Sequence, residues 1–209
     1  MDALDSNFEG HEALRQKLLD VPKFGNDDDY ADEQTAWVRH VYAQETVKHK
    51  NTRGGHRVPF EIPLGGYVAA GVRVGALPSG RLAGQPLADS CGPTGGSDLN
   101  GPTSIIKSVG KVNNAEIYGG QTLNLRLDTK IFDDKMGFKR MADFIRTVID
   151  LKLHHAQLNI VSSDVLKAAQ EDPDSYPDLM VRVAGYVAQF VGLPKNLQDT
   201  IVARTEHRL

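Results

Sequence analysis

The chain has 209 residues, of which 40% are hydrophobic and 24% are charged, and its formal net charge is −3. This length fits one domain, or one and a half at most, with enough apolar residues to bury a core. The weakly acidic balance does not favour nucleic acid or a membrane as partner, and no apolar run approaches the roughly 18 residues of a membrane helix. One cysteine, Cys91, excludes an internal disulfide. Together with an N-terminus unlike a signal peptide, it favours a cytoplasmic protein.

The first part of the chain is expected to be helical. Residues 11–20 have helical spacing and end before Pro22, and a second helix is expected to run to about Lys50. The carboxylates of residues 27–29 stand at the start of this second helix, where they suit the positive end of the helix dipole.

The stretch 57–103 differs in amino-acid composition from the rest of the chain. It holds half of the chain's 20 glycines and few helix formers, which is typical of loops and short strands. Its low charge and interspersed Val, Leu and Ile argue against disorder, and a loop-rich segment of this length is usually functional. A strand is expected further along the chain, at 121–127.

Helices and strands alternate in the remainder. A helix is expected over 135–152, a strand over 157–163, a helix capped by Ser163 and a last helix that begins at Pro194. This alternation indicates α/β units. The stretch MVRVAGYVAQFVGL at 180–193 has the composition of a strand, yet Gly185 stands within it. Such a glycine usually marks a bulge or the close approach of another backbone, and spacing alone favours that explanation.

The residues around Gly185 resemble the signature of the glycyl radical enzymes, RVxGYxxxFxxL. All six fixed positions match, at Arg182, Val183, Gly185, Tyr186, Phe190 and Leu193. Three other blocks are similar to segments of the same family, in the same order: NFEGHEALRQKLL with PKFGNDDDYAD, ALPSGRLAGQPLADSCGPTGGSDLNGPTS, and HHAQLNIVSSDVLKAAQEDPDSYPDLMVRVAGY. The resemblance runs in register from Asn7 to Leu209.

The resemblance implies an α/β fold. Family members form a ten-stranded barrel of two five-stranded parallel halves, with a glycine radical loop inserted into its centre opposite a cysteine loop. This chain would supply the C-terminal half: residues 1–56 as an N-terminal helical segment, 57–134 as a loop-rich barrel and pocket segment, and 135–209 as the glycine radical domain. Because a half-barrel leaves strand edges and an apolar inner face uncovered, we expect an obligate partner with a large interface.

The resemblance also implies why residue 185 is glycine. In this family that residue is stored as a carbon radical, which flattens and is delocalised into both flanking amides, and a Cβ would clash with the planar arrangement. The expected cofactor is therefore the glycyl radical at Gly185, and no bound metal is expected. An activating enzyme that uses S-adenosylmethionine and an iron–sulfur cluster would install the radical. To reach that enzyme, the segment from about Tyr176 onward would have to be mobile.

Four signature residues are expected to support the radical loop. Arg182 would hold it by pairing with carbonyls or a carboxylate, although an exposed arginine is the plainer alternative. Val183 belongs to the same loop. Tyr186 and Phe190 would pack around it and keep solvent away, with ordinary core residues as the alternative. His154 and His155 are adjacent and point to different sides of a strand, so a packing role is favoured over a metal site.

The sequence has no counterpart of the family cysteine whose thiol acts with the radical. In full-length members this cysteine lies upstream of the segment resembling Asn7, and a glutamate usually follows it two residues later. Here Cys91 lies in the loop-rich segment, and Pro93 stands two residues after it. We expect a buried structural thiol, with a pocket-lining role or the catalytic thiyl as weaker alternatives.

Three explanations account for a radical-storing chain without its cysteine. The favoured one is the small subunit of a split enzyme, whose large subunit carries the cysteine loop and the rest of the barrel; an N-terminal Met at the start of a family block supports it. The alternatives are a segment of a longer enzyme and a spare-part protein that repairs an oxygen-damaged homologue. The substrate would be a small organic molecule that undergoes C–C, C–O, C–N or C–S cleavage, or radical addition.

Overall fold

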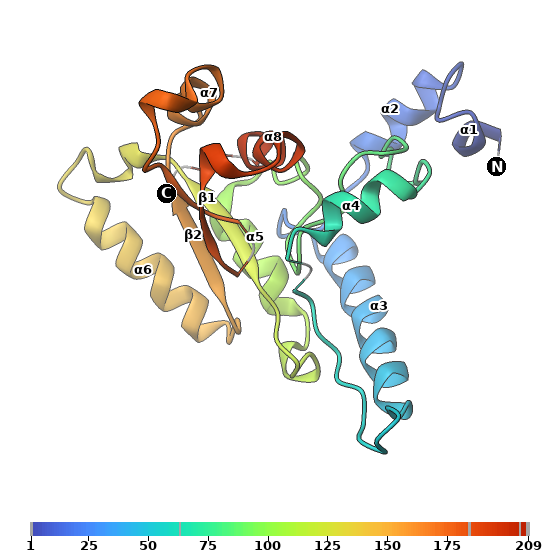
Figure 1. Ribbon diagram of the computed structural model, residues 1–209. Helices are drawn as coiled ribbons and strands as arrows, with labels where there is room; N and C mark the ends of the chain where they lie inside the picture. Colours follow the sequence, from blue (N-terminus) through green and yellow to red (C-terminus); the bar gives the residue numbers. More distant parts are fainter. Residues whose placement is uncertain (1, 63, 184, 205, 208–209) are drawn as a thin grey trace.

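The computed structural model describes residues 2–62, 64–183, 185–204 and 206–207. Four helices come first, α1 (Asp2–Asp5), α2 (Glu12–Asp20), α3 (Asp29–Lys48) and α4 (Gly66–Arg73), and they lie to one side of the molecule in Figure 1. No helix among the described residues is long and apolar enough to cross a membrane. Helix α3 begins as expected from its acidic start, because the Asp28 carboxylate accepts the N–H of Ala31.

The glycine-rich stretch contains more helix than its composition predicts. Helix α4 lies wholly within 57–103, and α5 (Gly101–Lys111) begins at its end. The expectation of loops and short strands alone is therefore wrong for these segments. Glycine lowers helix propensity, but tertiary packing overrides it: at Gly71 in α4 an added Cβ would lie 2.3 Å from the backbone oxygen of Gln85. The helix thus needs glycine to pack against the 85–86 backbone.

A parallel sheet of three strands, in the order β2-β1-β5, forms the centre. Its members are β1 (Leu123–Leu127), β2 (Ala156–Ile160) and β5 (Glu206–His207). Helix α6 (Gly137–Asp150) connects β1 to β2. One face of the sheet is apolar and packs against α5 and α6 in a core that contains Cys91, Ile105, Ile106, Val109, Leu123, Leu125 and Phe144. This is the α/β arrangement expected, although the described residues hold three parallel strands of the five implied for a half-barrel.

The opposite face of the sheet is polar. Asn124 and Arg126 of β1 stand beside Gln157 and Asn159 of β2 in the parallel register, and all alternate with the leucines of the apolar face. Three of these four side chains are buried, at 2–6% exposure. The expected apolar inner face is therefore wrong for these strands, because this face binds backbone groups of the C-terminal segment rather than apolar side chains.

The C-terminal segment packs as a second layer over the end of the sheet. Helix α7 (Ser163–Glu171) is capped by the Ser162 hydroxyl, one residue earlier than expected. After the short 3₁₀ turn Pro173–Ser175 come β3 (Met180–Arg182), β4 (Val187–Gln189), a further turn at Phe190–Gly192, and α8 (Lys195–Ala203). Their own core consists of Leu166, Ala169, Val181, Val183, Phe190 and Ile201.

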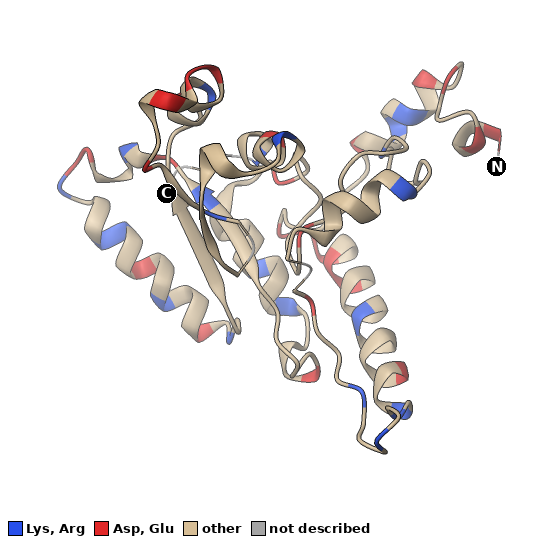
Figure 2. Ribbon diagram, viewed as in Figure 1, with Lys and Arg blue, Asp and Glu red and all other residues tan. Residues whose placement is uncertain are grey.

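Charged residues fix α3 against α5. Lys111 lies within 2.9 Å of carboxylate oxygens of Asp27, Asp29 and Asp32, and Lys107 binds Asp27 at 2.9 Å. Figure 2 shows charges of both signs spread over the helices, with acidic residues at the start of α3. Asp27 and Asp29 are therefore paired with lysines of α5, while Asp28 between them caps α3.

Candidate functional site

Gly185 lies in the turn of a hairpin, not within a strand. Strands β3 and β4 pair antiparallel, with Arg182 opposite Val187, and the Val183 N–H donates to the Tyr186 oxygen at 2.9 Å. Gly185 has φ +93°, a conformation that L residues rarely adopt. The expectation of one strand interrupted by a glycine is thus corrected, because the chain reverses direction here.

Packing does not require a bare Cα at this position. A Cβ on Gly185 would meet Leu64 Cδ2 at 3.4 Å, and Gln157 Nε2 and Ile62 Cγ2 at 4.0 Å, all at ordinary contact distance. None of these atoms belongs to a backbone, so close approach of another chain segment does not explain the glycine. The residue is also exposed in this chain. The positive φ of residue 185 is the structural reason for glycine at this position. Because Gly185 is exposed in this chain, its Cα is accessible to another molecule.

Two side-chain amides of β2 attach the hairpin to the sheet. Asn159 bonds both backbone groups of Arg182, accepting its N–H at 2.8 Å and donating to its oxygen at 2.8 Å. Two residues earlier on the same face, Gln157 Oε1 accepts the N–H of Gly185 at 3.2 Å. The hairpin is thus held to β2 by side chains in place of a backbone ladder.

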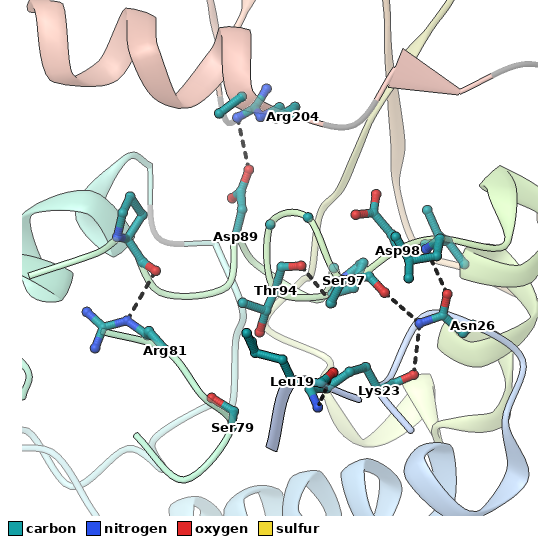
Figure 3. A pocket seen from close by; sticks show the side chains of 18 of the residues that line it. Leu19, Lys23, Asn26, Ser79, Arg81, Asp89, Thr94, Ser97, Asp98 and Arg204 are labelled. Atoms are coloured by element: carbon teal, nitrogen blue, oxygen red, sulfur yellow. Dashed lines mark hydrogen bonds and ion pairs between the residues drawn. The ribbon is translucent and has the colours of Figure 1, made fainter. Parts of the chain in front are cut away.

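Arg204, which follows α8, holds the stem of the hairpin from the other side. Its guanidinium donates to the oxygens of Arg182 at 3.3 Å and Val183 at 2.6 Å, and it pairs with Asp89 at 3.0 Å. Tyr67 Oη completes the group at 3.4 Å, and burial raises the pKa of the Tyr67 hydroxyl. Figure 3 shows Arg204 and Asp89 pointing toward each other.

A cavity of about 1210 Å³ adjoins this ion pair. Polar side chains from distant parts of the chain line it, including Asn26, Arg81, Asp89, Asp98 and Arg204 (Figure 3). His207 also lines this cavity. His207 Nε2 lies 2.9 Å from Asp98 Oδ2 in the wall. The cavity thus brings segments from both halves of the sequence to the base of the hairpin.

The residues predicted to support the loop have different environments. Val183 and Phe190 are fully buried, whereas Tyr186 is 40% exposed. Arg182 contributes its backbone groups, and its side chain has no hydrogen bond or ion pair among the described residues. The carbonyl contacts expected of Arg182 are made by Arg204. The supporting role of the Arg182, Tyr186 and Phe190 side chains stays a prediction.

Sequence reasoning missed Gln157, Asn159, Arg204 and Asp89. A signal existed for the first two, because polar residues alternate with Leu158 in a predicted strand and so share one face. No local signal existed for the other two, which are 115 residues apart.

The environment of Cys91 is not that of a reactive thiol. It is 1% exposed within the core of the sheet, and its S–H donates to the Thr122 oxygen at 3.2 Å. Burial raises the pKa of this thiol to about 12. The environment is that of the structural thiol expected from the sequence.

Known proteins are similar to this chain over nearly its whole length. Residues 87–191 match the family described as Glycine radical, and residues 1–71 match the family described as Pyruvate formate lyase-like. The chain is 40% identical to isethionate sulfite-lyase of Bilophila wadsworthia and 39% identical to trans-4-hydroxy-L-proline dehydratase of Clostridioides difficile. Each match covers 99% of this chain, and 25% and 26% of the two relatives. The chain thus spans about a quarter of the length of these curated relatives.

Solved structures of similar proteins have the same fold as this chain. The glycerol-bound B12-independent glycerol dehydratase of Clostridium butyricum superposes with a TM-score of 0.95 at 38% identity, over 100% of this chain and 26% of that one. A glycyl radical enzyme of Archaeoglobus fulgidus gives 0.95 at 36% identity, over 100% and 27%.

Proposed function

Since the chain belongs to the glycyl radical enzyme family, we propose that it is the radical-storing part of a lyase or dehydratase, with Gly185 as the storage residue. The observation that carries this proposal is the placement of the RVxGY signature. It forms a hairpin turn whose glycine is exposed, adopts a positive φ and is fixed through its N–H by Gln157.

The chemistry follows from the backbone. Loss of one hydrogen atom from the Gly185 Cα leaves a radical that both neighbouring amides stabilise, so the carbon exchanges a hydrogen atom reversibly with a thiol. The rest of the chain orients the turn, while Gly185 itself is exposed in this chain. Val183 and Phe190 anchor both strands of the hairpin in an apolar core, while Asn159 and Arg204 hold its backbone.

The thiol would come from outside these 209 residues. Cys91 is the chain's only cysteine. It is 1% exposed in the core against the apolar face of the sheet, whereas Gly185 is bound at the polar face through Gln157, and this placement opposes a role as hydrogen donor. We therefore assign the cysteine and most of the substrate pocket to a large subunit. The alternatives are that they belong to another segment of one longer enzyme, or that the chain repairs a damaged full-length homologue. An S-adenosylmethionine-dependent activating enzyme with an iron–sulfur cluster would remove the hydrogen.

The relatives suggest the reaction class. A sulfite-lyase and a dehydratase are among the most similar proteins, and these names describe C–S and C–O cleavage. A small substrate that loses water or sulfite is therefore favoured over one that undergoes C–C cleavage or addition.

Anaerobic co-expression with an activating enzyme, with and without a cysteine-bearing partner, tests the proposal. We expect a doublet EPR signal, and turnover only when the partner is present. Mass spectrometry of polypeptides that co-purify with the chain separates the alternatives. A protein resembling only the remaining three-quarters of the relatives supports the split enzyme, and a complete homologue supports repair. Turnover by the purified, activated chain alone would overturn the partner requirement.

A further inference from the structure

Gln157 is buried beside Gly185 with half of its amide unused. The side chain is 2% exposed. Its Oε1 accepts the Gly185 N–H at 3.2 Å, but its Nε2 has no hydrogen-bond partner among the described residues. The unused nitrogen lies 4.0 Å from the point where a Cβ on Gly185 would stand.

Asn159 shows what a structural amide looks like on this face. It is two residues along β2, and both ends of its amide bond Arg182 at 2.8 Å. A buried donor without a partner destabilises a fold, and an apolar side chain of similar volume avoids that penalty. Stability alone therefore explains Asn159 but does not explain a glutamine at 157.

We propose that Gln157 is a positioning residue for the radical carbon, and this inference rests on the proposed function. The bond from the Gly185 N–H restrains rotation about the N–Cα bond. That rotation sets how far the preceding amide overlaps with an unpaired electron on Cα. The side chains of Ile62 and Leu64 lie on the same side of Gly185 as the Gln157 amide.

Gln121 supplies a matched control. It is also 2% exposed, its Nε2 donates to Asn114, and its Oε1 has no partner among the described residues. Gln157→Met and Gln121→Met each replace a half-bonded, buried amide with an apolar chain of similar size. Gln157→Glu keeps an oxygen acceptor for Gly185 and serves as the conservative variant.

The first measurement is amide hydrogen exchange at Gly185, by NMR on the full chain without activation. We expect exchange about fivefold faster in Gln157→Met, wild-type exchange in Gln121→Met and Gln157→Glu, and a thermal midpoint of Gln157→Met that is no lower than wild type. Unchanged exchange in Gln157→Met, or equal acceleration in Gln121→Met, would overturn the assignment of the hydrogen bond.

The second measurement is EPR of the anaerobically activated protein. We expect altered hyperfine splitting and faster radical decay in Gln157→Met, with the wild-type spectrum in Gln121→Met. Identical spectra and decay in the two variants would overturn the positioning role. Absence of any radical in the activated wild type would instead contradict the proposed function, while the exchange experiment still tests the bond to Gln157.

Discussion

The guanidinium of Arg204 lies 3.0 Å from the Asp89 carboxylate, and both side chains are largely buried, at 12% and 17% exposure. Because the same guanidinium bonds the Arg182 and Val183 oxygens, Asp89 fixes an arginine that in turn fixes the stem of the glycine hairpin. This ion pair thereby joins the loop-rich segment to the C-terminal segment.

Replacement of Arg204 by Met should destabilise the chain by about 2–4 kcal/mol, because it leaves a buried carboxylate unpaired and removes two bonds to carbonyl oxygens. Urea denaturation measures the change. Arg146→Met is the control, since Arg146 and its partner Asp143 are 71% and 49% exposed; its effect should stay within about 0.5 kcal/mol. Equal effects of the two substitutions would show that the Asp89 pair adds nothing.

The Cys91 thiol should resist alkylation in the folded chain. With its pKa raised to about 12 by burial, its thiolate fraction at pH 8 is at least about a thousandfold below that of a free cysteine. Labelling with iodoacetamide, followed by mass spectrometry, should be very slow in buffer and rapid in urea. Rapid labelling of the folded chain would restore Cys91 as a candidate hydrogen donor.

The contact between α3 and α5 should weaken in acid. Hydrogen bonds from Lys111 and then Lys107 lower the pKa of Asp27. A lowered folded-state pKa stabilises the fold above the unfolded value of about 4, and this contribution is lost as pH falls through the folded value. Thermal midpoints below about pH 4 should therefore fall more steeply for wild type than for Asp27→Asn. Asp178→Asn, on the exposed surface, is the control and should follow wild type. Parallel curves for wild type and Asp27→Asn would contradict the assignment.

The periodic helices were predictable because their apolar residues repeat at helical spacing. Residues 11–20 and 135–152 were expected as helices and are observed at Glu12–Asp20 and Gly137–Asp150. Helix α4 was not expected, since its sequence GYVAAGVR carries two glycines. Gly71 allows α4 to pack against the backbone of Gln85 and Pro86, which no local pattern reveals, whereas an added Cβ at Gly66 would meet nothing within 4 Å.

The sequence alone was enough to predict Gly185 as the central residue of the site, but not the side chains that support its turn. A contiguous signature of six positions points to Gly185, and the comparisons confirm the family. The turn itself was missed because β3 and β4 together have the composition of one longer strand. The supports of the turn depend on which residues face each other across the sheet and across the chain, as with Asp89 and Arg204. Such pairings follow from the tertiary fold and leave no local trace.

Air should cut the activated chain at Gly185, because oxygen adds to a backbone radical and the peptide then breaks at that carbon. Intact mass spectrometry of a sample with a verified EPR signal should show a fragment ending next to residue 185 and loss of the C-terminal piece. Unactivated chain exposed to the same air should stay whole. An uncut chain after loss of the signal would contradict the assignment of the radical to this residue.

The central claim is that Gly185 stores the radical, and EPR of the anaerobically activated Gly185→Ala variant tests it most directly. Alanine at φ +93° is strained by about 1–2 kcal/mol, so circular dichroism should still show a folded chain. Gly192→Ala is the matched control, because Gly192 has no positive φ and no heavy atom within 4 Å of an added Cβ. We predict a doublet in wild type and Gly192→Ala and no signal in Gly185→Ala. A doublet that persists in Gly185→Ala would contradict the account.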